Sequence, residues 1–425
     1  MDESAFRPNK CIDYEAIIDA TLIFHKLVFS MGFWMSSFQD RVTKFIERGL
    51  GEGLLSLDDY EALMEVLEEA GKITTIHPEL YAGLLRDTFE ELPKIAGEAE
   101  KEISKLIGRL KSGGLRVHQV NVDETMWSLG ALGSDASSCP MPIGMMKVAY
   151  ISGMAYREGT SPVIMRDFIT ASNDEMGRRE FKFYYQVLAE ALIPAACIRH
   201  IKEYGAPDCV VIDGPLSASL LLRRIPYRRG LRKEVHSEMQ EKAYRLIRLR
   251  DQLIELCYEK GIPVFSVVKR CTSRHFLAWY ELKDEYPYTD QFVFHQLLDY
   301  GQRTGSISIS KAIERQGAEE FARFNEIYGF YIKSSRNPLT PPIRVEYPEF
   351  LKQKEDWIAS YVLTTSLTTY EAEFDGLPKP VCLVHKDAKI TKAIMKEIYR
   401  RVVTKMLHEG ANIKLLGSIW GFSLG

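Results

Sequence analysis

One carboxylate of this chain lies where the sequence predicts the end of a buried strand. Asp213 follows an apolar run from Cys209 to Ile212, and Gly214 and Pro215 come directly after it. This pattern predicts a strand that presents Asp213 at its C-terminal edge. Ligands of open α/β sheets bind at such edges, and hard divalent cations bind several oxygen atoms. Asp213 therefore predicts a metal site, provided that other carboxylates join it.

Glu190 is the first candidate partner. It lies on the predicted helix that leads into the Asp213 strand, and apolar residues flank it. Glu180 and Glu203 are the alternatives on the same helix, and Glu203 has the surroundings of a solvated side chain. We therefore expect Glu190 to be the carboxylate that faces the edge of the strand.

Asp135 and Asp123 are the two candidates for a third carboxylate. Asp135 ends a predicted strand of small residues, before a predicted loop that contains Pro140 and Pro142. Asp123 also stands at the end of a predicted strand. An Asp beside a Ser commonly forms only a turn, so the residues alone leave this choice open.

Lys269 and His385 are the candidate accessory residues. Lys269 comes directly after an apolar strand over residues 264–268, and beside a metal and a phosphate it would stabilise negative charge. His385 follows an apolar run over residues 381–384. That setting is equally consistent with a core histidine and with a proton shuttle or phosphate contact.

The densest basic run of the chain follows soon after Asp213. It contains one aromatic residue among six basic ones: Arg223, Arg224, Tyr227, Arg228, Arg229, Arg232 and Lys233. Basic side chains with an interleaved aromatic ring are typical of a surface that holds a nucleic-acid backbone. Arg245, Arg248 and Arg250 extend the positive charge along the next helix. Nothing in the sequence suggests readout of bases, so we expect little sequence preference.

These side chains require a sheet to position them. Strands are predicted at residues 117–122, 127–132, 146–154, 163–169, 209–212, 264–268, 330–332 and 343–346. Helices are predicted at residues 174–204 with a kink at Pro194, at 232–260 and at 390–408. Strands followed by a strand–helix–strand unit predict a mixed α/β sheet flanked by helices. We expect a helical N-terminal region over residues 1–112 and an α/β domain over residues 113–425.

Composition sets the class of protein. The chain has 425 residues, 46% of them hydrophobic and 27% charged, which is ordinary for a globular protein. The net charge of −3 means that any nucleic-acid role depends on a local basic patch. Seven scattered cysteines without a Cys-x-x-Cys pair argue against a zinc site and favour a reducing cytoplasm. No Walker phosphate-binding motif occurs, which disfavours an ATPase.

The N-terminal residues carry two further expectations. The acidic start of the chain predicts no secretory signal peptide. The apolar stretch over residues 16–35 is interrupted by Asp19, His25 and Lys26, so we expect an assembly interface or a buried helix there rather than a membrane span.

Taken in order, the motifs resemble the NurA nuclease family over about residues 125–400. The segments that carry the resemblance are residues 127–137, 148–159, 210–216, 261–269, 344–348 and 376–388. The most specific is Val210-Val-Ile-Asp-Gly-Pro-Leu, which contains Asp213. The chain departs from the family where Ala136, rather than glycine, follows the first aspartate.

The resemblance implies an RNase H-like core and a manganese-dependent nuclease that acts on DNA ends. It further implies a homodimer that works with a hexameric HerA-type ATPase in the resection of double-strand breaks. Asp135, Glu190 and Asp213 would be the metal ligands, with Lys269 and His385 beside the scissile phosphate. Carboxylates suit Mn²⁺ or Mg²⁺ rather than zinc, and two such ions can cleave a phosphodiester.

Two other functions remain open on the sequence. The chain is also consistent with a catalytically weak adaptor that docks on a HerA-like translocase, because Ala136 departs from the family pattern. It is also consistent with another RNase H-like enzyme, such as an RNA-directed nuclease or a resolvase. Cleavage assays with metal on DNA and on RNA separate the three.

Overall fold

The computed structural model describes residues 97–143, 146–172, 177–217, 233–314, 326–367 and 374–410. By its internal contacts the chain divides into a unit that ends at Glu102 and a unit from Ile103 to Gly425. The fold below is that of the second unit. Residues 1–96, with the apolar stretch 16–35, and the basic residues 223–232 lie outside the described residues.

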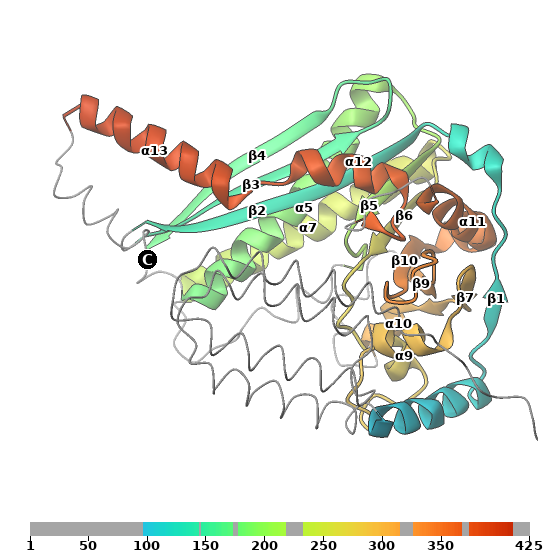
Figure 1. The fold of residues 1–425 in the computed structure, drawn as a ribbon. Helices are drawn as coiled ribbons and strands as arrows, with labels where there is room; N and C mark the ends of the chain where they lie inside the picture. The colour runs from blue at the N-terminus through green and yellow to red at the C-terminus, as the bar shows by residue number, and fades with distance from the viewer. Residues whose placement is uncertain are drawn as a thin grey trace, which may run out of the picture. The chain divides into compact units, whose positions relative to one another are not determined.

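Five strands form the centre of the second unit. β2 (Ala131–Ile143), β3 (Met146–Tyr156) and β4 (Val163–Ser172) make an antiparallel meander. β5 (Cys209–Asp213) and β6 (Val264–Val268) lie on the other side of β2, and both run parallel to it. The order β4-β3-β2-β5-β6 is the arrangement of an RNase H-like core, as expected (Figure 1).

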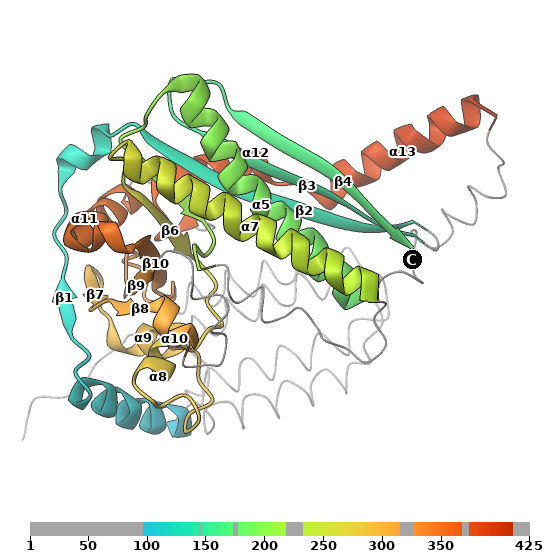
Figure 2. The ribbon, with the colours of Figure 1, turned by 180° about the vertical axis from the view of Figure 1, so that it is seen from behind.

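Two long helices make the connections within this core. α5 (Arg178–Tyr204) joins β4 to β5, and α7 (Lys233–Glu259) joins β5 to β6. Pro194 lies inside α5. Both helices pack on the same face of the sheet, where they cross the strands seen from behind in Figure 2. Their apolar residues, such as Ile193 and Leu253, share one core with Val210 and Ile212.

Further strands widen the sheet beyond β6. β10 (Ile343–Pro348) pairs antiparallel with β6, and β9 (Ile327–Ile332) pairs antiparallel with β10. The remaining strands are β7 (Gln302–Thr304) and β1 (Val117–Gln119), which complete the order at that end, and β8 (Ile307–Ser308), which pairs with β9.

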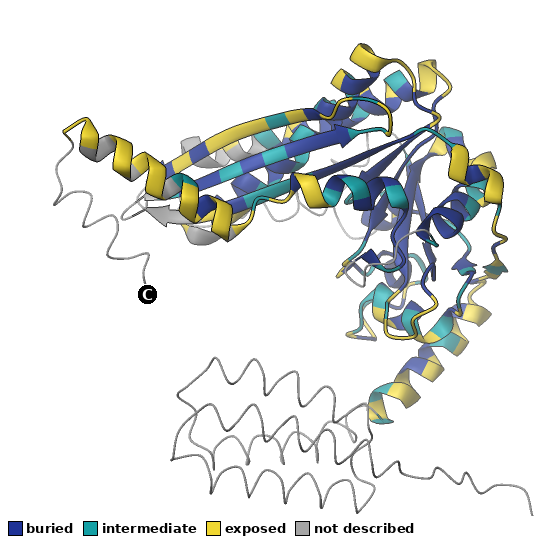
Figure 3. Cartoon of the chain, turned by 45° about the horizontal axis from the view of Figure 1, so that its top comes forward, coloured by how far each residue is buried: buried dark blue, intermediate teal, exposed yellow. Residues whose placement is uncertain are grey.

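Helices cover both faces of the widened sheet. The face of α5 and α7 also carries three short helices: α8 (His275–Trp279), α9 (Asp290–Leu297) and α10 (Ile309–Glu314). The opposite face carries α11 (Glu355–Ser366), which a short 3-10 helix over Glu349–Lys354 precedes, and α12 (Lys379–Ala388). In Figure 3 the strands are mostly buried, whereas α13 (Lys392–His408) is mostly exposed. No helix among the described residues is both long and apolar enough to cross a membrane.

Two glycines allow the helices to approach the sheet closely from its two sides. A Cβ at Gly133 of β2 would lie 2.0 Å from the carbonyl oxygen of Pro380 in α12. A Cβ at Gly153 of β3 would lie 2.5 Å from Cβ of Leu192 in α5. The sequence therefore leaves room for a helix on each face beside the point where β2 meets β5.

The structure corrects the expected strand at residues 127–132. A 3-10 helix over Glu124–Ser128 occupies its first part, and β2 begins only at Ala131. Asp123 caps that 3-10 helix, since its side chain accepts hydrogen bonds from the backbone amide and the hydroxyl of Thr125. A capping role therefore accounts for Asp123.

The expectation of a loop at Pro140 and Pro142 was also wrong. β2 continues through both prolines to Ile143, paired with β3 along its whole length beyond Gly133. Its pairing with β5 ends at Ser134, so beyond that residue β2 is an edge strand on that side. Proline is tolerated on such an edge because its missing amide hydrogen leaves no partner unpaired.

Candidate active site

Asp135 and Asp213 lie side by side where β2 and β5 separate. The last parallel pair between the two strands joins Ser134 to Ile212, and each aspartate is the next residue of its strand. Both side chains point to the α12 face, since Ser134 and Ile212 face α5 and α7 and side chains alternate along a strand. The Asp135 side chain is 9% exposed and that of Asp213 12%.

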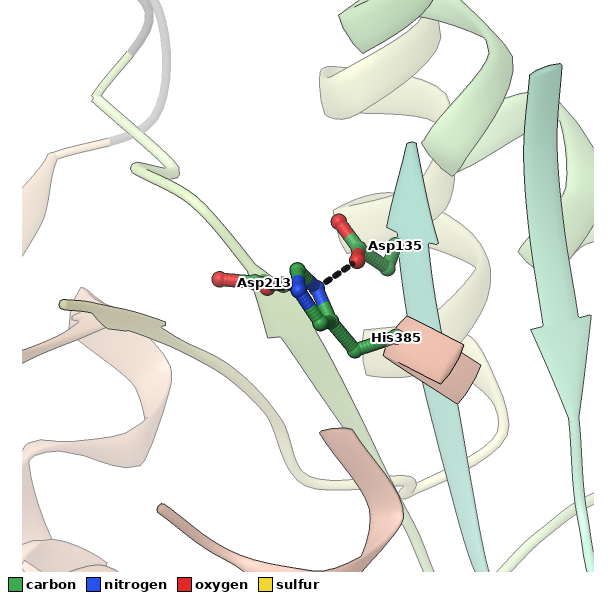
Figure 4. Close-up of side chains that lie close together, drawn as sticks. All are labelled: Asp135, Asp213 and His385. Atoms are coloured by element: carbon green, nitrogen blue, oxygen red, sulfur yellow. Dashed lines mark hydrogen bonds and ion pairs between the residues drawn. The ribbon is translucent and has the colours of Figure 1, made fainter. Parts of the chain in front are cut away.

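His385 reaches both aspartates from α12. Its Nδ1 lies 2.6 Å from Oδ2 of Asp135 and 3.6 Å from Oδ2 of Asp213. Figure 4 shows the imidazole ring between the two carboxylates. The segment is a helix with one buried face: Val381 and Val384 pack on the sheet, and His385 occupies its partly exposed side. His385 therefore lies in the candidate site and not in the apolar core.

Lys269 completes the cluster from the end of β6. Its Nζ lies 2.6 Å from Oδ2 of Asp213 and 3.4 Å from Nδ1 of His385. Val267 and Lys269 alternate with Val268, which places Lys269 on the α12 face with the other three residues. Four of the five residues expected at the site are thus together, and they come from β2, β5, β6 and α12.

The carboxylates and the imidazole alter one another's protonation. Burial raises the pKa of the Asp135 carboxyl above its usual range, the Asp213 carboxylate adds to the rise, and the hydrogen bond with His385 opposes it. The hydrogen bonds to Asp135 and Asp213 raise the pKa of His385 to about 9. The His385 imidazole and the Lys269 ammonium offset the repulsion between the two carboxylates, and a divalent ion can do the same.

The same atoms can hold a metal ion. Asp135, Asp213 and His385 each offer a ligand atom within 4.8 Å of the others, the one such group found in the described part of the chain. Two carboxylates and an imidazole suit Mn²⁺ or Mg²⁺ better than a thiolate-loving ion. The convergence of these ligand atoms at one edge of the sheet is the observation that fits this cluster to a metal.

Glu190 lies outside that cluster. Its Oε2 accepts a hydrogen bond of 2.7 Å from Nη2 of Arg250, a residue of α7 with 5% of its side chain exposed. Burial raises the pKa of the Glu190 carboxyl, Arg250 opposes the rise, and the Asp213 carboxylate adds to it. Glu190 therefore interacts electrostatically with Asp213 from the α5 side of the sheet, while its carboxylate is hydrogen-bonded to Arg250.

Arg250 was expected among the exposed basic residues, and that expectation was wrong. It is buried between α5 and α7, and its Nη1 donates to the carbonyl of Leu216 just after Asp213. The helical spacing explains the difference, because Arg250 shares the inner face of α7 with Ala243, Leu246 and Leu253. Arg245 and Arg248 are exposed, as expected.

The remaining candidates have separate places. Glu180 is buried in the first turn of α5, and Glu203 pairs with Arg199 one turn away. Lys233 is the first residue of α7, and the other members of the basic run lie outside the described residues. Their role in DNA binding stays a prediction.

A buried ionic network beside the site was missed from the sequence. Glu346 of β10 accepts hydrogen bonds from the amide and the hydroxyl of Ser217, at 2.8 and 3.0 Å, and pairs with Arg344 at 2.7 Å. Arg344 and Glu346 are 1% and 0% exposed. Glu346 thus anchors the chain at Ser217, shortly after Asp213. Two charged residues in an otherwise apolar strand were the signal that could have indicated it.

One family model matches the chain. The NurA domain model matches residues 142–390, more than half of the chain, and begins after Asp135. No curated protein matches the chain by sequence. The fold is similar to the crystal structure of the NurA nuclease from Sulfolobus solfataricus, with 15% identity, a TM-score of 0.49, and 79% of this chain and 98% of that chain covered.

More distant structures are similar over much of the chain. A NurA bound to dAMP and manganese has 10% identity and a TM-score of 0.46, with 72% of this chain and 95% of that chain covered. Human ENDOV has 12% identity and a TM-score of 0.29, with 70% and 99% covered. Because the NurA model extends over most of the strands and helices described above, the chain belongs to the NurA family of nucleases.

Proposed function

We propose that this protein is a Mn²⁺-dependent deoxyribonuclease that cleaves single-stranded DNA and DNA ends, with Mg²⁺ as an alternative ion. One observation carries the proposal. Asp135 and Asp213 occupy adjacent positions on two neighbouring parallel strands, and His385 and Lys269 form ion pairs with them. A metal-dependent hydrolase of phosphodiesters uses paired carboxylates to hold the ion and nearby cations to neutralise the phosphate.

The proposal gives each residue a role. Asp135 and Asp213 would hold the metal, and Glu190 would join them at the edge of the sheet after leaving Arg250. The bound ion would supply a polarised phosphate and an activated water. Lys269 neutralises a phosphate oxygen from its position beside Asp213, and His385 holds Asp135 in place and exchanges a proton near the scissile bond.

The proposed partners follow from the family. A second copy of the chain and a hexameric HerA-type ATPase would assemble with this protein in the cytoplasm during resection of double-strand breaks. We propose that residues 1–112, and the stretch 16–35 above all, make these contacts. Deletion of residues 1–35 is expected to abolish the dimer in light scattering and the binding of a HerA-type ATPase. A truncated chain that still dimerises and binds the ATPase would contradict this assignment.

Asp213→Asn tests the site itself, because it removes the charge and keeps the shape. We expect cleavage of single-stranded DNA in Mn²⁺ to fall by more than about 100-fold, the upper end for residues that only support a ligand. Saturating Mn²⁺ is expected to stabilise the wild type by about 2.7 kcal/mol at 100 times its dissociation constant, and the variant by much less. The matched control is Asp167→Asn, an exposed aspartate of β4.

The outcomes separate the candidate functions. Near wild-type cleavage by Asp213→Asn would show that the site is elsewhere. A wild-type protein that binds Mn²⁺ but cleaves neither DNA nor RNA would be an adaptor. Cleavage of RNA in preference to DNA of the same sequence would replace the proposed substrate.

A further inference from the structure

The loop between β9 and β10, residues 333–342, lies at the edge of the sheet that carries the candidate site. Arg344 of β10 pairs with Val268 of β6, so the loop returns to the sheet beside Lys269. Gln291 fixes this relationship, since its Nε2 donates to the carbonyls of Lys269 and Pro342 at 2.7 and 2.9 Å. The 333–342 loop is therefore attached to the residue that holds Asp213.

The same loop is attached to the segment that leads into α12. Ser335 and Thr340 both donate to Oδ2 of Asp375, at 2.6 and 2.5 Å, and Ser334 donates to the carbonyl of Gly376 at 2.5 Å. The neighbouring Phe374 packs edge-on against the His385 ring, with the ring centroids 5.6 Å apart. The loop thus connects to both sides of the candidate site.

Internal hydrogen bonds hold the loop in one conformation. Lys333 is 5% exposed, and its Nζ donates to the carbonyls of Asn337, at 2.7 Å, and Thr340. The Asn337 amide donates to the Ser335 hydroxyl, and the Leu339 amide donates to the side chain of Asn337, both at 2.9 Å. A buried ammonium that carbonyls surround fixes the backbone around it, because moving the loop would leave the charge unpaired.

This fixed loop holds an apolar side chain in solvent. Leu339 is 83% exposed, the highest value among the exposed large apolar side chains of the described residues. In the same loop, Arg336 is exposed and lies over the ring of Tyr300, 5.2 Å from its centroid. Single exposed leucines are common on protein surfaces, but this one stands on a backbone that its own amide bond to Asn337 helps to hold in place.

We propose that Leu339 is a wedge that stacks on the last base pair of a duplex end and separates its strands, so that one strand reaches the site. Apolar side chains on rigid elements unstack base steps in this way in other DNA-binding proteins. Arg336 contacts the backbone beside the wedge. The inference rests on the proposed function and adds to it the form of DNA that the protein engages.

The spacing fits an end close to the cut. β10 is two strands from β5, which is about 10 Å. The loop that carries the wedge thus returns to the sheet on the strand next to β6, at the same edge as Lys269.

The test compares two substrates of one sequence, a single strand and a blunt duplex, in Mn²⁺. Leu339→Ala is expected to lower the ratio of duplex to single-strand cleavage by about tenfold, which is about 1.4 kcal/mol of lost strand separation. Leu339→Phe, which keeps a large apolar tip, is expected to restore the ratio. Ile164→Ala is the matched control, because Ile164 is a 57% exposed apolar residue of β4 outside the site.

A binding measurement supports the proposal independently of cleavage. 2-Aminopurine at the terminal pair of the duplex should brighten when Asp213→Asn binds it, and brighten less with Asp213→Asn/Leu339→Ala. An unchanged cleavage ratio, or equal brightening by both proteins, would overturn the wedge. If the wild type cleaves no single-stranded DNA, the proposed function fails instead, and brightening that depends on Leu339 still decides the wedge.

Discussion

Asp135 and Asp213 are the first residues after the last paired positions of two neighbouring parallel strands, and both face α12. Beyond Ser134 and Ile212 the two strands no longer pair, so the two carboxylates lie at the edge of the paired region. The relationship makes the pair rigid, because Asp135 also pairs with Met154 of β3 and Asp213 with Val267 of β6. It also explains why one histidine of α12 contacts both.

The role of Glu190 can be separated from its pairing with Arg250. Glu190→Gln keeps a hydrogen-bond acceptor for Arg250 and removes the charge that a metal would bind. If Glu190 is a ligand, cleavage falls by more than about 100-fold and the stabilisation by Mn²⁺ shrinks. Glu203→Gln, on the exposed side of the same helix, is the control. Lower stability with an undiminished response to Mn²⁺ would mean that Glu190 serves only to bind Arg250.

Gly133 is predicted to set the position of His385. Gly133→Ala would place a Cβ 2.0 Å from the carbonyl oxygen of Pro380, so α12 must move away from β2. Unfolding free energy is expected to fall by about 1–3 kcal/mol, and a shift of about 1 Å at His385 to cost about 100-fold in cleavage.

Gly108→Ala is the control for this substitution. Gly108 lies in the helix over residues 97–112, and a Cβ there would meet nothing within 4 Å. We expect that variant to gain about 0.5–1 kcal/mol, since alanine is the better helix former. Chemical denaturation measures both changes. A Gly133→Ala protein with normal stability and cleavage would show that α12 does not depend on the close approach.

Asp290 makes the stability of the fold depend on pH. Its carboxylate accepts hydrogen bonds from the backbone amides of Phe276 and Leu277 at the start of α8. Its complete burial nevertheless raises the pKa of the carboxyl to about 6. A raised pKa favours the protonated form in the folded state, so its contribution to stability is present below pH 4 and is lost as pH rises to about 6. The loss is about 3 kcal/mol for two pKa units.

Asp290→Asn removes this titration and keeps an acceptor. Urea denaturation between pH 4 and pH 7 should therefore show the variant gaining on the wild type by up to about 3 kcal/mol as pH rises. Parallel curves for the two proteins would mean that Asp290 titrates normally in the fold.

The basic residues 223–233 are predicted to hold the DNA backbone. Phosphate contacts release counterions, so the slope of log affinity against log salt for single strands is about 0.7 per contact. Replacing Arg228 and Arg229 with alanine should reduce that slope by about 1.4 if both make a contact. Replacing Arg400 and Arg401 of α13 removes the same charge elsewhere. Equal slopes for the wild type and the Arg228/Arg229 variant would put the DNA path on another surface.

The sequence by itself determined the strands that present Asp213 and Lys269. Both residues follow short runs of buried apolar side chains, and such runs are a local property that depends on burial rather than on partners. The β-rich part after residue 114 and the long helices at α5, α7 and α13 were predicted for the same reason. The motifs also indicated the family, because their order along the chain is a property of the sequence and does not depend on the tertiary structure.

Only the tertiary structure decided which side chains meet. Asp135 lies in the middle of β2, and its place beside Asp213 depends on pairing between strands far apart in the chain. His385 enters from a helix that packs against the sheet only because Gly133 carries no side chain. The pairing of Glu190 with Arg250 could not be predicted from the sequence. Arg250 lies on the buried face of α7, and the basic residues around it in the sequence do not indicate which of them is buried. Local periodicity encodes which residues are buried, whereas long-range packing selects their neighbours.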